Sequence, residues 1–156
     1  MNVVAAIIER DGQVLICQRK AGQYYGGKWE FPGGKVEAHE EFRSALEREL
    51  REELAITAAI GDEIARYQYT YPGRRPIQLI FFRVTEFEGE PANVVFEQIR
   101  WEKTANMPAY DFLDGDVEFV KSLAKCYLPD GGSRKSTLRS RFKRPESSRS
   151  TRSSET

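Results

Sequence analysis

Several features that mark whole classes of protein are missing from this sequence. It has only two cysteines, Cys17 and Cys126, and one histidine, His39. Two cysteines provide neither a disulfide framework nor a complete zinc site and fit a reducing compartment, so we expect a cytoplasmic protein. No run reaches the roughly 18 apolar residues of a membrane-spanning helix. The first apolar run has no basic stretch before it and leads into a charged turn, which argues against a secretory signal.

An excess of one charge is also lacking, since 24 Lys and Arg balance 24 Asp and Glu. Such a chain is not a uniformly basic nucleic-acid-binding protein. The charges are nevertheless unevenly divided. Residues 129–156 carry eight basic and three acidic residues, whereas residues 1–128 carry 16 basic and 21 acidic residues.

The C-terminal segment differs from the rest in composition too, with few apolar residues and many Ser and Arg. Because it cannot bury enough apolar surface to offset the entropy of ordering, we expect a domain over 1–128 and a disordered basic tail over 129–156. A solvated tail with weak attraction to polyanions is favoured over an anchor for nucleic acid or a membrane surface. No specific nucleic-acid binding and no membrane partner are expected.

Hydrophobic patterning predicts an alternation of strands and helices. Apolar spacings of three and four indicate helices over about 40–54 and 117–127. Short β-rich runs bounded by turn residues predict strands at 3–8, 13–18, 28–31, 64–71, 77–87 and about 94–101. The strand at 28–31 is expected to stop at Pro32-Gly33-Gly34. Together these elements predict an α/β sandwich with a mixed sheet.

The first predicted helix carries an acidic cluster. Glu49, Glu52 and Glu53 are spaced i, i+3, i+4 and share one helix face. Crowded carboxylates repel one another unless a cation lies among them, and Mg²⁺ prefers oxygen ligands. Taken alone, the cluster fits a solvated, salt-bridged helix face better than a metal site, because Arg48 and Arg51 offset part of the charge.

The residues around the cluster make a longer pattern. Gly33-Gly34 predicts a tight turn that lets backbone approach a phosphate or metal. Five residues separate Gly34 from Glu40, and seven residues separate Glu40 from the segment Arg48-Glu49-Leu50-x-Glu52-Glu53. This arrangement resembles the Nudix box, G-x5-E-x7-R-E-U-x-E-E-x-G-U, in which U is aliphatic. Ala55 replaces the last glycine, so we expect a left-handed helix C-cap formed by alanine at modest cost.

The resemblance extends over about residues 1–125, because VVAAIIERDGQVLICQR and KWEFPGGKVE are similar to MutT-type Nudix hydrolases. It implies an α/β/α sandwich with two main helices, and hydrolysis by water at a phosphorus atom. It favours cleavage of nucleoside triphosphates, such as the oxidised nucleotide 8-oxo-dGTP, to NMP and pyrophosphate. A CTP/dCTP-type or broad pyrophosphatase is the alternative, and a non-catalytic nucleotide- or nucleic-acid-binding module is less favoured. Monomer and homodimer both stay open.

The resemblance also implies roles for individual residues. Mg²⁺, with Mn²⁺ as a possible substitute, would be held by the Gly33 carbonyl, Glu49, Glu52 and Glu53. Arg48 would orient Glu49, Gly34 and Glu40 would support the cluster, and Arg19 and Lys35 would contact phosphates. The chemistry agrees independently, because a divalent ion neutralises a polyphosphate and aligns a water without a Ser or Cys nucleophile.

The general base and the base-recognition residues are open at this point. Glu97, ahead of Trp101, is the candidate base, with Glu52 or Glu53 as alternatives. Asp114 is the candidate for reading the nucleobase, although Asp114 or Asp116 also suits an N-cap of the last helix. An ionised Asp only accepts hydrogen bonds, which weakens a preference for 8-oxoguanine.

Aromatic residues near the glycine turn are candidates for stacking on the base. Phe31, Trp29 and Tyr110 are suited to this, although all three also fit a hydrophobic core. His39 is expected at the start of the first helix and Cys17 in the core.

Overall fold

The structure, a computed structural model, describes residues 1–126. The predicted tail over 129–156 lies outside the described residues. The strands are β1 (Asn2–Arg10), β2 (Gln13–Gln18), β3 (Trp29–Glu30), β4 (Gly33–Lys35), β5 (Thr57–Ala59), β6 (Glu63–Tyr69), β7 (Ile77–Val84), β8 (Glu86–Glu88) and β9 (Gln98–Glu102). The helices are α1 (Phe42–Leu54), α2 (Val117–Cys126) and the 3₁₀ helices η1 (Thr104–Ala109) and η2 (Asp114–Asp116).

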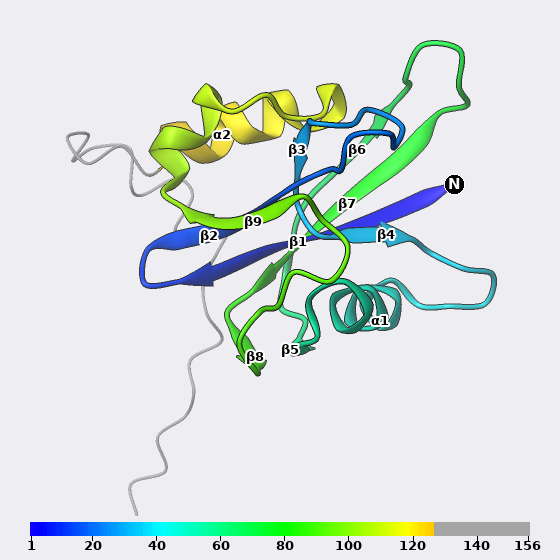
Figure 1. Cartoon of the computed structure of the whole chain (residues 1–156). Coiled ribbons are helices and arrows are strands. Elements are labelled where there is room, and N and C mark those ends of the chain that lie inside the picture. The colour runs from blue at the N-terminus through cyan, green and yellow to red at the C-terminus, as the bar shows by residue number, and fades with distance from the viewer. Residues whose placement is uncertain (127–156) are drawn as a thin grey trace, which may run out of the picture.

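The main sheet is mixed and lies between the two α-helices (Figure 1). Its strands run in the order β3-β2-β1-β7-β6, and β4 and β9 pair with β1 and β2. The central strand β1 is parallel to β7 and antiparallel to β2 and β4. A small second sheet joins β5 to β8. The expected α/β/α sandwich with a mixed sheet and two main helices is therefore confirmed.

The central strand β1 explains why the core has two halves. Its residues alternate between faces, so Val4, Ala6 and Ile8 lie in one buried cluster and Ala5 and Ile7 in the other. The first cluster includes the apolar stripe of α1, and the second includes that of α2. A strand covered on both faces needs a continuous apolar run, as the sequence VVAAII provides.

Helix α1 ends as expected despite the missing glycine. Ala55 has φ 56° and ψ 33°, and its N–H donates to the carbonyl of Arg51 at 3.1 Å. A left-handed C-cap is thus formed by alanine, at a cost of about 1 kcal/mol.

The start of α1 was predicted slightly too early. The helix begins at Phe42 after the N-cap Glu41, so Glu40 precedes it, and His39 lies in the preceding turn with φ 65°. The physical reason is local, because the Glu40 carboxylate accepts the N–H of Glu37 at 3.0 Å and so closes a turn.

Two strand predictions also need correction. The strand predicted at 28–31 does stop before Pro32, since β3 ends at Glu30, but Gly33 and Gly34 start the further strand β4 because they pair with the backbone of β1. The strand predicted from about residue 94 begins only at Gln98. The side-chain amide of Asn93 donates to the carbonyl of Phe96 and accepts its N–H, which holds this segment in a turn. None of the helices within residues 1–126 is long and apolar enough to cross a bilayer.

Candidate active site

The glycine turn lies unusually close to its neighbours. A Cβ on Gly33, whose φ is 154°, would stand 2.0 Å from the carbonyl oxygen of Val4. A Cβ on Gly34 would stand 2.5 Å from the carboxyl carbon of Glu49. Only glycines allow β4 to pack this tightly between β1 and the acidic face of α1.

Two glutamates of α1 meet this turn. The N–H of Gly33 donates to the Glu53 carboxylate at 3.3 Å. Burial, followed by repulsion from the Glu49 and Glu30 carboxylates, raises the pKa of Glu53 to about 9. Carboxyl groups crowded in this way favour a bound cation, and their oxygen atoms are donors that Mg²⁺ prefers.

Arg48 connects the remaining residues of the box. Its Nε and Nη2 donate to Glu40 at 2.8 and 3.0 Å, and its Nη1 donates to Glu49 at 3.0 Å. Hydrogen bonds from Arg48 and from the Glu37 N–H lower the pKa of Glu40 to about 2. Arg48 therefore holds the Glu49 side chain, whose carboxyl group lies beside Gly34.

Glu52 lies apart from the other two glutamates. Its side chain is 59% exposed and contacts the Nη1 of Arg48 at 3.3 Å. Within residues 1–126, no three acidic, His or Cys side chains already stand together as a metal site. The structure therefore brings Glu49 and Glu53 together at the glycine turn and leaves Glu52 outside this pair.

A further carboxylate near the glutamates of α1 belongs to Glu30 on β3, which the sequence analysis did not identify. Arg19 pairs with it at 3.0 Å and also donates from Nε to the carbonyl of Tyr24 at 2.9 Å. Repulsion from Glu30 contributes to the raised pKa values of both Glu53 and Asp116, so Glu30 lies near both groups. Arg19 therefore forms an ion pair with Glu30. The contacts of Arg19 and Lys35 with substrate phosphates stay predictions.

The turn before α2 presents a buried acid. Asp114 is exposed, whereas Asp116 is only 6% exposed. Burial, followed by repulsion from Glu30, raises the pKa of Asp116 to about 8. The 3₁₀ helix η2 has no side-chain cap hydrogen bond. The sequence offered no signal for Asp116 beyond its place ahead of an apolar helix.

A cavity of about 600 Å³ opens beside this turn. It is lined by Tyr24, Tyr25, Tyr71, Arg74 and Ile77, among others. Tyr71 links the cavity to the turn, because its hydroxyl accepts the N–H of Gly115 at 3.0 Å.

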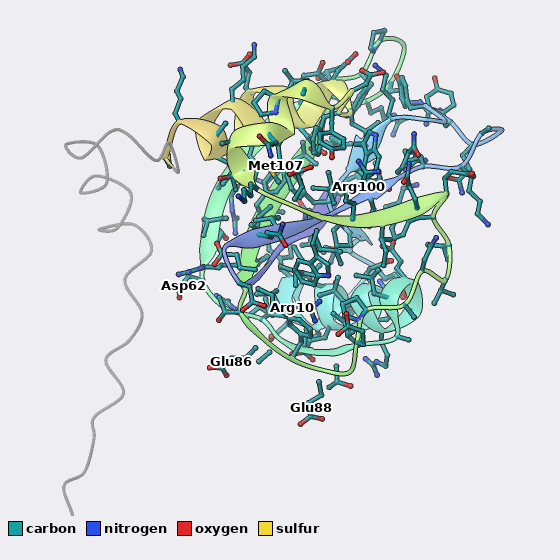
Figure 2. The ribbon with its side chains drawn as sticks, turned by 60° about the vertical axis from the view of Figure 1, so that its left-hand side comes forward. Arg10, Asp62, Glu86, Glu88, Arg100 and Met107 are labelled. Carbon is teal, nitrogen blue, oxygen red and sulfur yellow. The ribbon has the colours of Figure 1, made fainter. Side chains whose placement is uncertain are left out.

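A larger cavity of about 860 Å³ lies around the β1–β2 turn and includes Arg10 and Glu86, which Figure 2 labels. Glu49 and Glu53 do not line it. Its Arg10 is already paired with Glu90 at 2.7 Å. Glu49, Glu53 and Asp116 do not line the smaller cavity either, but its Tyr71 contacts the turn before α2 through Gly115.

Two further predicted residues have clear positions. Phe31 is 4% exposed, and its ring contacts Phe81, Phe112 and Phe119 in the core. Glu97 is exposed on the loop that follows β8. The N–H of Val94 in that loop donates to the carbonyl of Glu53 at 3.2 Å, which brings the loop to the end of α1. Base stacking by Phe31 and proton transfer by Glu97 stay predictions.

The fold and the network of box residues define a Nudix hydrolase, an enzyme that acts on diphosphate bonds. The model of the NUDIX domain matches residues 1–123, and the chain belongs to this family.

Relatives whose names state an activity agree with this class. The chain is 40% identical over 122 residues to the CTP pyrophosphohydrolase of Escherichia coli strain K12, which covers 78% of this chain and 90% of the relative. It is 35% identical over 124 residues to the 8-oxo-dGTP diphosphatase of Haemophilus influenzae, covering 79% and 90%. The solution structure of the E. coli ORF135 protein matches with a TM-score of 0.71 and 39% identity, covering 80% of this chain and 89% of that one. The protein is a Nudix pyrophosphohydrolase of nucleotide substrates.

Proposed function

We propose that this protein is a Mg²⁺-dependent enzyme that hydrolyses nucleoside triphosphates to the monophosphate and pyrophosphate. Its favoured substrates are oxidised or non-cognate dNTPs such as 8-oxo-dGTP. The observation that carries the proposal is the buried Glu53 beside Glu49 at the glycine turn, since like charges crowded there favour a divalent cation. Mn²⁺ is expected to substitute. The free, well-separated cysteines fit action in the reducing cytoplasm, as a monomer or homodimer.

Each residue of the site has a distinct task in this proposal. Glu49, Glu53 and the Gly33 carbonyl hold the metal, joined by Glu52 once it turns inward. A bound divalent ion neutralises phosphate charge and lowers the pKa of the attacking water. Arg48 keeps Glu49 oriented, and Glu40 in turn holds Arg48.

The remaining tasks concern phosphates and a proton. Arg19 and Lys35 contact the phosphates of the substrate. Glu97 takes the proton of the attacking water, with Glu52 or Glu53 as the alternative general base.

Asp116 is a better candidate than Asp114 for reading the nucleobase, because it is buried in the turn that Tyr71, a residue of the tyrosine-lined cavity, contacts through Gly115. With a pKa raised to about 8, its carboxyl is protonated at neutral pH, so it both donates and accepts. Such a group can donate to O6 and accept from N7–H of 8-oxoguanine. An ionised Asp could not donate to O6, so the protonated state makes Asp116 compatible with a preference for 8-oxoguanine.

A second candidate function is CTP or dCTP hydrolysis. The same protonated carboxyl can donate to N3 and accept from the N4 amino group of cytosine. The relative named CTP pyrophosphohydrolase, at 40% identity, also favours it. A non-catalytic nucleotide- or nucleic-acid-binding module is the remaining rival.

Pyrophosphate release with Mg²⁺ tests the proposal directly. The substrates are the four dNTPs, 8-oxo-dGTP, CTP, ADP-ribose and a dinucleoside polyphosphate. Glu53→Gln is expected to lower turnover by several orders of magnitude, because a ligand charge is lost at the reacting phosphate. The matched control, Glu47→Gln, changes an exposed glutamate of the same helix and is expected to be silent. Near-normal turnover by Glu53→Gln would refute the catalytic role, and nucleotide binding without any turnover would favour the non-catalytic module.

A further inference from the structure

The peptide of Gly115, which precedes Asp116, is held on both sides by tyrosines. The hydroxyl of Tyr67 donates to the Gly115 carbonyl at 2.5 Å. The hydroxyl of Tyr71 accepts the Gly115 N–H at 3.0 Å. Tyr67 lies on β6 and Tyr71 just beyond its end, four residues apart and so on the same face of the chain. Two hydrogen bonds from a neighbouring strand thus fix the orientation of this peptide.

The turn also packs against these rings without space for a side chain. A Cβ on Gly115 would lie 2.7 Å from the Tyr71 hydroxyl oxygen and 3.2 Å from a ring carbon of Tyr69. Gly115 is buried, as is Asp116 beside it. The backbone that leads into Asp116 is therefore held by β6 and the residues just after it, which lie far from it in the sequence.

Burial keeps the two hydroxyls in the hydrogen-bonding form that the geometry requires. It raises the pKa of Tyr67 well above its ordinary value, and that of Tyr71 to about 12. Tyr67 remains a donor at every pH at which an enzyme of this kind is assayed. Removing its hydroxyl would leave the buried Gly115 carbonyl without its partner, which is costly in a dry environment.

We propose that Tyr67 and Gly115 are positioning residues that set the nucleobase selectivity of this enzyme. The Tyr67–Gly115 hydrogen bond holds the turn so that Asp116 meets the base edge at the correct distance. Selectivity is lost when the turn shifts, because a displacement of about 1 Å is enough to disrupt such a contact. The inference rests on the proposed role of Asp116 in reading the base.

The variant Tyr67→Phe removes one oxygen atom and leaves the ring in place. Its matched control is Tyr69→Phe, since the Tyr69 hydroxyl makes no hydrogen bond among the residues that the structure describes. We expect Tyr67→Phe to raise KM for the preferred nucleotide about tenfold with little change in kcat, and to leave KM for poor substrates unchanged. The control should keep the selectivity of the wild type. Equal scaling of all substrates, as general destabilisation would produce, overturns the proposal.

Gly115→Ala perturbs the same turn by adding an atom instead of removing a hydrogen bond. The same loss of selectivity is expected, because the new Cβ must displace Tyr71 or the turn. If this variant fails to fold, Tyr67→Phe decides alone.

Binding of nucleoside monophosphates without metal separates the inference from the proposed activity. Titration calorimetry with CMP, dGMP and 8-oxo-dGMP should show base discrimination in the wild type and its loss in Tyr67→Phe. Discrimination lost in the variant supports the positioning role even if no triphosphate is hydrolysed. Identical discrimination in both proteins overturns that role even if hydrolysis is established.

Discussion

Replacing Asp116 by Asn should make the stability of this protein much less dependent on pH. Asp116 is only 6% exposed, and its pKa is raised from 3.8 to about 8. Burial is the larger cause and repulsion from Glu30 the smaller one. Between pH 4 and pH 8 the folded protein keeps a proton that the unfolded chain releases.

The direction of the effect follows from this difference in proton binding. Because the folded state binds more protons, the free energy of unfolding falls as pH rises from about 4 to about 8. A shift of about 4 units, at about 1.4 kcal/mol per unit, corresponds to roughly 5 kcal/mol. This is an upper bound, because local opening of the turn would let Asp116 ionise at lower cost. Asn cannot ionise and has nearly the shape of the protonated acid.

Urea unfolding at each pH from 4 to 9 measures the effect. Asp116→Asn and the wild type should have nearly equal stability at pH 4, and the variant should gain about 2–5 kcal/mol over the wild type by pH 8. The matched control, Asp114→Asn, changes an exposed acid two residues away and should stay parallel to the wild type. A difference between Asp116→Asn and wild type that stays within about 1 kcal/mol across this range would refute the buried, protonated state.

Three further changes test other parts of the structure. Ala55→Gly should stabilise the protein by about 0.5–1 kcal/mol in urea unfolding, because glycine relieves the left-handed cap; a loss of stability would contradict this. Gly34→Ala should raise the Mg²⁺ concentration needed for half-maximal turnover at least about tenfold, since the new Cβ collides with the Glu49 carboxylate; an unchanged Mg²⁺ requirement would speak against this close packing. Deletion of 130–156 should leave the melting temperature and turnover nearly unchanged, as its composition predicts; a fall in melting temperature of more than about 4 °C would show that it contributes to folding.

The sequence alone determined the elements whose signals are local. Spacings of three and four residues marked α1 and α2, and the apolar run VVAAII marked the central strand. The pattern from Gly34 to Glu53 also singled out Glu40, Arg48 and Glu49, which hydrogen bonds join at the start and middle of α1. The left-handed cap at Ala55 followed from the same pattern.

Contacts between distant elements were decided only by the tertiary structure. Glu30 of β3, Tyr67 of β6 and Asp116 before α2 come from three parts of the chain, and no local spacing relates them. Asp114 and Asp116 look alike in the sequence, but packing against β6 buries one and exposes the other. The β4 strand formed for a similar reason, since β1 offered its backbone to Gly33 and Gly34. Burial depends on which elements pack together, and this is why the sequence located the glutamate cluster of α1 but only the fold showed which acid before α2 is buried.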